Sequence, residues 1–299
     1  MSHESEIREK PKRLREEVAW QCPRLFGRQG PGSPALVLAL NIQCSCSMAS
    51  STILAHSHCD DCFRGVKHSG TAAGQTVTIA DVPTYVSNQP SATAGSPKKV
   101  ILFFADIYGP FSLNNELVQD YFASQGFCVL GIDYFLGDPV SLHTEAGFDR
   151  LAWVGAKRKT ADEITPKWLA EVRKMHGPES KYCAVGYCFG APYVMELGAT
   201  DDIVAAAFAH PAFLDEDHFR KLKQPLLLSC AETDFTFALE SRRRAEDILV
   251  EVKAQYQFQV FSGVQHGFAL RGDPSVPDAR WAKEESASGI VRWFSRFCA

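Results

Sequence analysis

The sequence predicts an α/β fold in which helices cover both faces of a mostly parallel sheet. From about residue 75 onward, short apolar runs alternate with segments of helical spacing, which is the pattern of repeated strand–helix–strand units. The runs are apolar at nearly every position, as in strands that are buried on both faces. In such sheets functional groups gather at the carboxyl ends of the strands.

The first predicted elements are short. Residues 77–79 and 84–86 are expected to form strands, and Pro83 between them marks a break or an edge because proline cannot donate to a strand ladder. Residues 99–104 are predicted to be a buried strand. Residues 115–125 have helical spacing and end before a glycine, which indicates a helix.

The rest of the chain repeats this alternation. The further predicted strands are residues 127–132, 183–187, 203–208, 225–229 and 256–261. The predicted helices are a segment from the end of the 183–187 strand to about residue 198, residues 240–254 and residues 279–297. Tryptophans at helical positions are predicted to be core residues: Trp153, Trp168, Trp281 and Trp293.

Composition excludes several classes of protein. The chain has 299 residues, of which 45% are hydrophobic and 22% charged, which argues against a disordered, collagen-like or disulfide-stapled protein. Its formal net charge of -4 gives no basic footprint for nucleic acid and does not predict binding to anionic membranes. No apolar run reaches the ~18 residues that a membrane-spanning helix requires.

The cysteines and the N-terminus predict a cytoplasmic protein. Several of the 10 cysteines, such as Cys128 and Cys230, lie in apolar runs and behave as small hydrophobic residues, so we expect a reducing compartment and no disulfide framework. The first apolar run, residues 35–40, is too short and too late for a signal peptide.

Residues 1–47 differ from the rest of the chain. A charged stretch leads into a segment rich in glycine and proline, and no strand–helix alternation is visible. A flexible extension and a coding segment that the functional protein lacks are both favoured over a structured appendage. We predict one folded domain over residues 48–299.

The strongest chemical signal is Gly186-Tyr187-Cys188-Phe189-Gly190, at the end of a predicted strand and the start of a helix. This is the position of a nucleophile elbow, with cysteine in place of the more usual serine. Its glycines avoid collisions with neighbouring backbone, and the nucleophile sits in a strained conformation that costs ~1–3 kcal/mol. The thiol is expected to be reachable by solvent at a helix N-terminus, where the dipole favours a thiolate. The alternative is a buried structural cysteine between packing glycines.

Partners for this nucleophile follow in the expected order, first an acid and then a histidine. Asp234 and His266 each lie just past the end of a predicted strand. We therefore predict a triad of Cys188, Asp234 and His266, with Glu232 as the alternative acid. Alternatively, Asp234 caps the next helix and His266 is an ordinary loop histidine.

Stabilisation of the oxyanion should contribute more than ionisation of the thiol. Complete ionisation of a free thiol gains at most ~30-fold, or roughly 2 kcal/mol. Removal of one oxyanion donor typically costs ~2.7–4 kcal/mol. The predicted donors are the backbone N–H groups of Phe189, which follows the nucleophile, and of Ile107, in the loop after the strand at residues 99–104.

These features together resemble the dienelactone hydrolase family over about residues 55–299. The elbow, Asp234 and His266 carry the resemblance, with two further motifs: Ala105-Asp106-Ile107-Tyr108-Gly109, and His266-Gly267-Phe268-Ala269 with Arg271. Fungal members are the most similar, because their N-terminal Cys-x-x-Cys and histidine resemble Cys59, Cys62 and His68. The resemblance implies an α/β-hydrolase fold and hydrolysis of a small lactone or ester through a thioester, without a cofactor. We expect a monomer or homodimer.

The resemblance also implies how the substrate is held. Asp106 takes the place of a carboxylate that helps to generate the thiolate, although it is one methylene shorter than the glutamate more common in the family. Arg271 falls on an arginine that binds the substrate carboxylate, and the alternative is a surface arginine beside Asp273. Tyr187 and His210 are further predicted substrate contacts. The family also has a second arginine that binds the substrate, and no motif places it in this sequence. Three basic residues lie in the corresponding region: Arg150, Lys157 and Arg158.

The sequence leaves a metal site and two other functions as weaker possibilities. A group of residues near the N-terminal side of the domain has the ligand types of zinc, but only one Cys-x-x-Cys is present, so we predict packing and no metal. The group comprises His56, His58, Cys59, Cys62 and His68. Two alternative functions are a hydrolase or thioesterase acting on a polyketide-type biosynthetic intermediate, and a catalytically silent binding protein of the same fold.

Overall fold

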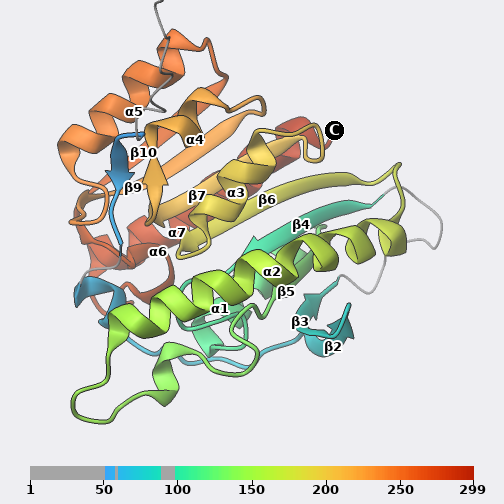
Figure 1. The fold of residues 1–299 in the computed structure, drawn as a ribbon, viewed down its shortest axis with the longest axis horizontal. Helices are drawn as coiled ribbons and strands as arrows, with labels where there is room; N and C mark the ends of the chain where they lie inside the picture. Colours follow the sequence, from blue (N-terminus) through green and yellow to red (C-terminus); the bar gives the residue numbers. More distant parts are fainter. Residues whose placement is uncertain (1–50, 58–59, 89–97) are drawn as a thin grey trace, which may run out of the picture. The chain divides into compact units, whose positions relative to one another are not determined.

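The fold is that of a computed structural model, which describes residues 51–57, 60–88 and 98–299 (Figure 1). All of these residues belong to the compact unit Ala49–Ala299. The predicted extension at residues 1–47 and the domain boundary at residue 48 lie outside the described residues, as do His58 and Cys59, and remain predictions.

An eight-stranded sheet forms the centre of this unit and confirms the predicted α/β fold. Its order is β10-β9-β7-β6-β4-β5-β3-β2, and the pairs from β10 to β5 are parallel, whereas β3 and β2 are antiparallel. The strands are β2 (Gln75–Ile79), β3 (Val82–Ser87), β4 (Lys99–Phe104), β5 (Cys128–Ile132), β6 (Lys181–Cys188), β7 (Ala205–Pro211), β9 (Leu226–Thr233) and β10 (Tyr256–Gln265). A separate antiparallel pair joins β1 (Ile53–Ala55) to β8 (Leu214–Asp215).

Helices cover both faces of the sheet (Figure 1). The helices are α1 (Leu113–Ser124), α2 (Arg150–His176), α3 (Ala191–Gly198), α4 (Glu216–Arg220), α5 (Leu239–Glu251), α6 (Phe268–Arg271) and α7 (Pro277–Phe297), with the short turns η1 (Asp60–Phe63) and η2 (Val140–Leu142). Along β4, Leu102 packs in the cluster with α2 to α5, whereas Ile101 and Phe103 pack in the cluster with α1, α6 and α7. This alternation explains why β4 is apolar at every position after Lys99.

Two sequence expectations need correction. Trp281 is 57% exposed on α7 and is not a core residue, whereas the other three predicted tryptophans are buried. Pro83 does not interrupt the strands, because the turn is made by Ala80 (φ 48°) and Asp81 (φ 63°), a two-residue hairpin loop. Pro83 lies in β3 and pairs with Thr78 of β2. The pairing of β3 with β5 begins only at the next residue, so the missing N–H of Pro83 costs no hydrogen bond to β5.

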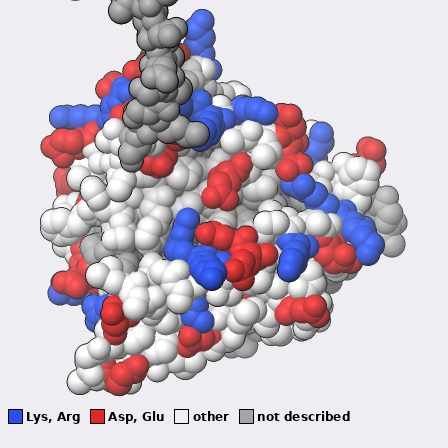
Figure 2. Space-filling view, viewed as in Figure 1, with Lys and Arg blue, Asp and Glu red and all other residues white. Residues whose placement is uncertain are grey.

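Acidic and basic side chains are interspersed on the face shown in Figure 2. Arg244, for example, forms ion pairs with Glu216 at 2.8 Å and with Glu251 at 2.9 Å. Among the described residues, no helix is both long and apolar enough to cross a membrane. The cytoplasmic location and the oligomeric state remain predictions.

Candidate active site

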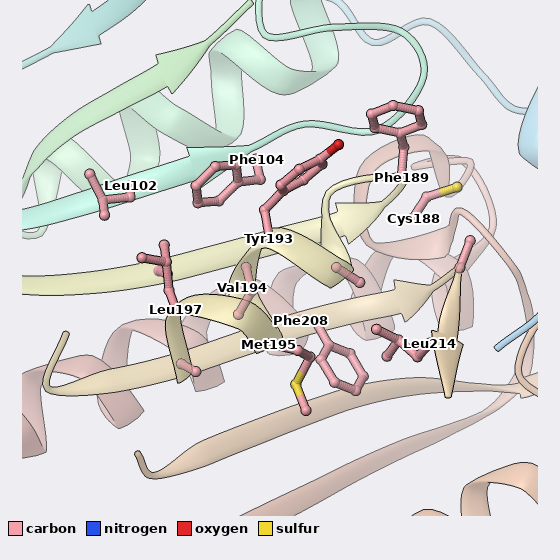
Figure 3. Packing of buried hydrophobic residues seen from close by; sticks show 14 of the residues in the cluster. Leu102, Phe104, Cys188, Phe189, Tyr193, Val194, Met195, Leu197, Phe208 and Leu214 are labelled. Atoms are coloured by element: carbon pink, nitrogen blue, oxygen red, sulfur yellow. The ribbon is translucent and has the colours of Figure 1, made fainter. Parts of the chain in front are cut away.

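The predicted elbow is built where β6 ends and α3 follows. Cys188 has a φ of 48°, in the left-handed region that non-glycine residues rarely adopt. A Cβ on Gly186 would lie 2.6 Å from the Gly190 oxygen, and one on Gly190 would lie 2.2 Å from the Phe104 oxygen. Both glycines are therefore required by close backbone contacts, as predicted. Figure 3 shows Cys188 and Phe189 together at the end of β6.

Asp234 and His266 lie directly after two adjacent parallel strands. β9 ends at Thr233 and β10 at Gln265, and these two residues pair in the sheet. The Nδ1 atom of His266 is 3.0 Å from both carboxylate oxygens of Asp234. In this contact the N–H group at Nδ1 donates to the carboxylate, so Nε2 is the ring nitrogen that can act as the base. The alternative acid Glu232 is exposed and accepts a hydrogen bond from the Gly263 N–H instead.

Asp234 and His266 each stabilise the charged form of the other. Burial disfavours a charged imidazole, but the Asp234 carboxylate and the Cys62 thiol outweigh burial and hold the pKa of His266 well above its ordinary value. Burial acts in the opposite direction on Asp234, yet His266 and Thr236 lower the pKa of its carboxyl. The pair therefore favours a proton on the imidazole.

Thr236 is a site residue that the sequence reasoning missed. Its hydroxyl oxygen lies 2.6 Å from Asp234 Oδ1 and 2.9 Å from His266 Nδ1, and it is fully buried. The backbone N–H of Thr236 also donates to Asp234 Oδ1 at 2.9 Å. The Asp-x-Thr spacing after a strand is its only sequence signal. Thr236 thus fixes the carboxylate against the imidazole.

A second cysteine lies against Cys188. The Sγ atoms of Cys62 and Cys188 are 3.6 Å apart, and the ligand atoms of both cysteines and of His266 all lie within 4.8 Å of one another. Both thiols have no exposed surface. The expectation of a solvent-reachable thiol is therefore wrong for this structure, because the segment carrying Cys62 packs against it. Cys62 was predicted only to pack, and its position beside Cys188 was not anticipated.

This cluster is also where a soft metal ion would fit. Within the described part of the chain, Cys62, Cys188 and His266 are the only group of potential ligands that meet closely enough. Zinc takes thiolate and imidazole ligands, and a carboxylate commonly orients such an imidazole. His68 is not part of the group, because its Nε2 lies 2.9 Å from the Gly272 oxygen. The predicted absence of a metal remains a prediction.

Asp106 contacts Arg271 rather than the thiol. Asp106 Oδ2 forms a buried ion pair with Arg271 Nη1, and its Oδ1 accepts from Asn115 Nδ2 at 3.0 Å and from the Tyr108 N–H at 3.1 Å. Among the described residues, no hydrogen bond joins Asp106 to Cys188. Arg271 is only 7% exposed, so the alternative of a surface arginine is wrong. Its Nε donates to the Arg64 oxygen at 2.8 Å, which ties the N-terminal segment to α6.

A cavity of about 430 Å³ opens beside this ion pair. Its lining includes Gly65, Tyr108 and Asn115 together with Asp106 and Arg271. The lining combines apolar surface with buried charge. Neither Cys188 nor His266 is among the residues that line this cavity.

Tyr187 and His210 lie behind the imidazole. The Tyr187 ring is 5.8 Å from the His210 ring, which is 4.9 Å from the His266 ring in an edge-to-face arrangement. Both side chains are buried, and burial holds the pKa of His210 well below its ordinary value. The structure therefore brings both against the catalytic candidates, and their predicted contact with substrate remains a prediction.

The three basic candidates on α2 have different surroundings. Arg150 lies 4.1 Å from the Phe63 ring centroid, and Lys157 forms an ion pair with Asp138 at 2.7 Å. The Arg158 guanidinium lies 5.8 Å from the ring of Phe189, the residue after Cys188. Arg158 is thus the candidate that contacts the elbow.

The expected oxyanion donors are backbone groups around the elbow. Within the described residues, neither the Phe189 N–H nor the Ile107 N–H donates a backbone hydrogen bond. The close approach of Gly190 to the Phe104 oxygen brings the elbow against the end of β4, shortly before Ile107. Both N–H groups therefore remain candidates.

A cysteine elbow between a strand and a helix, with an aspartate and a histidine at the ends of the following parallel strands, defines a hydrolase of the α/β-hydrolase fold. Comparison with known proteins agrees. The profile of the dienelactone hydrolase family matches residues 82–298. The chain belongs to this family, and it is an ester or lactone hydrolase, as predicted.

Several of the relatives are fungal proteins. Dienlactone hydrolase 1 of Gibberella moniliformis is 35% identical over 247 residues, which cover 80% of this chain and 93% of that protein. Hydrolase pyvD of Aspergillus violaceofuscus is also 35% identical over 247 residues, which cover 82% of this chain and 98% of that protein. Among solved structures, the chain is similar to the dienelactone hydrolase-like promiscuous phosphotriesterase P91 from metagenomic libraries, with a TM-score of 0.61 and 18% sequence identity. The alignment covers 76% of this chain and 99% of that one. That structure supports the fold alone.

Proposed function

We propose that the protein hydrolyses a small lactone or ester through a thioester on Cys188. The observation that carries the proposal is the Asp234–His266 contact at 3.0 Å beside a cysteine held in a strained elbow. A ring nitrogen of His266 and the Cys188 sulfur lie within 4.8 Å of each other, and we propose that rotation of the thiol brings it against Nε2.

The reaction follows from these positions. His266 takes the proton of Cys188 on Nε2, which its raised pKa favours, and the resulting thiolate attacks the substrate carbonyl. The N–H groups of Phe189 and Ile107 bind the oxyanion, and the imidazolium, oriented by Asp234, protonates the leaving oxygen. In a lactone that oxygen stays attached to the acyl group. Water, deprotonated by His266, then attacks the thioester, and the acid leaves with the thiol restored.

The Asp106–Arg271 pair supports a substrate that carries a carboxylate. Arg271 is the buried cation on the cavity wall, which Lys67 also lines, and a substrate carboxylate would replace Asp106 as a partner of Arg271. Such an exchange also moves the Asp106 charge, which is how we propose that this carboxylate influences the thiol. A neutral ester makes no such exchange.

Turnover of an enol lactone by matched variants tests this proposal. Cys188→Ala should abolish turnover, and Cys230→Ala, which removes another buried thiol, should not. Undiminished activity of Cys188→Ala would reject the assigned nucleophile. No observation favours a polyketide-type intermediate over a simple lactone, and a panel of lactones and thioesters distinguishes them.

A further inference from the structure

The two thiols at the site are close enough to react with each other. We propose that Cys62 and Cys188 form a redox modification site, in which a hydroperoxide converts them to a reversible disulfide that stops hydrolysis. Only the loss of hydrolysis rests on the proposed function. The disulfide itself depends on the two sulfur atoms alone.

The geometry favours this pair. The sulfur atoms are 3.6 Å apart although their residues are 126 positions apart in sequence. A disulfide bond is about 2.05 Å long, so small side-chain rotations must close the remaining gap. Neither thiol has exposed surface, and hydrogen peroxide is small enough to enter through local opening of the covering segment.

The segment that carries Cys62 is fixed on both sides of the cysteine. Before it, the His56 N–H donates to the Thr236 oxygen at 2.7 Å. After it, Arg271 Nε donates to the Arg64 oxygen at 2.8 Å, and the Val66 N–H donates to the Arg271 oxygen at 3.2 Å. These contacts bind the segment to the loops that carry Asp234 and His266, so the position of Cys62 is part of the site.

The chemistry balances with one hydroperoxide. The Cys188 thiolate attacks the terminal peroxide oxygen, the O–O bond breaks, and Cys188 sulfenic acid and an alcohol or water form after proton transfer. The Cys62 sulfur then attacks the sulfenic sulfur, the S–S bond forms and hydroxide leaves. The Cys62 proton passes to that hydroxide through His266, which gives water. The two thiols lose two electrons in total, and the peroxide gains them.

Cys62 would therefore act as a resolving thiol. A sulfenic acid with a neighbouring thiol becomes a disulfide that reductants reverse, whereas one without it proceeds to sulfinic acid, which they do not. The chain offers a matched control, because Cys183 and Cys298 form a second buried thiol pair with their sulfur atoms 3.3 Å apart. That pair packs with α7 on the other face of the sheet from the α2–α5 cluster.

The test treats the purified full chain with hydrogen peroxide in the presence of a chelator, and then blocks the remaining thiols. Peptide mapping without reductant measures the Cys62–Cys188 link, and lactone turnover is measured before treatment, after it and after dithiothreitol. We expect the linked peptide to appear as activity falls at least about tenfold, and dithiothreitol to restore most of the untreated rate.

The variants separate the explanations. Cys62→Ser and Cys62→Ala should form sulfinic acid at Cys188 and recover little activity, relative to each variant's own untreated rate. Cys298→Ser should behave as the unchanged protein does. Absence of the Cys62–Cys188 peptide, or equal recovery with and without Cys62, would overturn the proposal. If the enzyme turns over no lactone, the linked peptide still decides whether the pair forms, and only the proposed function fails.

Discussion

Arg271 and Asp106 form a buried ion pair on the wall of the cavity, and Arg271 at the same time donates to backbone oxygens of the segment that carries Cys62. One arginine thus links the acid of the early loop, the cavity and the segment that packs against the nucleophile. Removal of either charge breaks an ion pair that is buried in the fold.

Asp106→Asn should therefore destabilise the fold by about 3–5 kcal/mol, because it breaks the buried ion pair with Arg271. Urea denaturation measures this change. Asp217→Asn, which removes the carboxylate of the exposed Asp217–Lys221 ion pair, is the control and should change stability much less. Equal midpoints for the two variants would contradict the buried pairing.

Thr236→Val should lower kcat about tenfold with little change in KM, because the hydroxyl that positions Asp234 against His266 is lost while the cavity wall is kept. The pH dependence of kcat should shift as well, which a purely structural role would not produce. Thr160→Val removes the hydroxyl of a half-buried helix residue, which donates to the Ala156 oxygen, and serves as the control. An unchanged kcat and pH profile would reject the positioning role.

His210 should make the fold less stable in acid. Its folded-state pKa is depressed by burial and by His266, so neutral His210 is favoured in the folded protein. Its contribution to stability is therefore present above the unfolded pKa of about 6.5 and is lost as the pH falls below that value. His266 has a raised pKa and contributes with the opposite sign.

The difference between the unchanged protein and His210→Phe isolates the His210 contribution to stability. Denaturation curves between about pH 7 and pH 5 should show a smaller loss of unfolding free energy in the variant. Parallel losses in both proteins would show that His210 does not titrate in this way.

Arg271 and Arg158 are predicted to differ in how they select substrates. Arg271→Ala should raise KM for carboxylate-bearing esters by about tenfold more than for neutral esters, because it removes the buried cation of the cavity wall. Arg158→Met should affect both classes alike, because this guanidinium contacts the rings of Phe189 and Tyr193 beside the elbow. Michaelis constants for a matched pair of esters check both statements. If only Arg158→Met raised KM selectively for carboxylate-bearing esters, the substrate carboxylate would instead be bound by Arg158 on α2.

Local patterns predicted much of the fold and the positions of the main candidates. The central strands β5 and β7 are buried over their full length, and Gly186 of the elbow is required by a close contact with Gly190, four residues away. Asp234 and His266 were found because parallel strands end at one edge of the sheet. Each of these signals is short-range in sequence.

The features that sequence reasoning missed depend on long-range contacts. Cys62 reaches Cys188 from an irregular segment that has no periodic pattern, and this segment is why the thiol is buried. The partner of Asp106 is 165 residues away and was assigned to substrate instead. The 27-residue helix α2 was not predicted, because Pro166 lies inside it and proline usually ends a helical pattern.

The central claim is that Cys188 carries the acyl group. Rapid quenching of the enzyme with 4-nitrophenyl acetate, followed by digestion and mass spectrometry, locates the acetylated residue directly. The account predicts acetyl on Cys188 in the unchanged protein, in Cys62→Ser and, with slower turnover, in Thr236→Val. Acetyl on Cys62, or full turnover with no acetylated cysteine at any time, would contradict it.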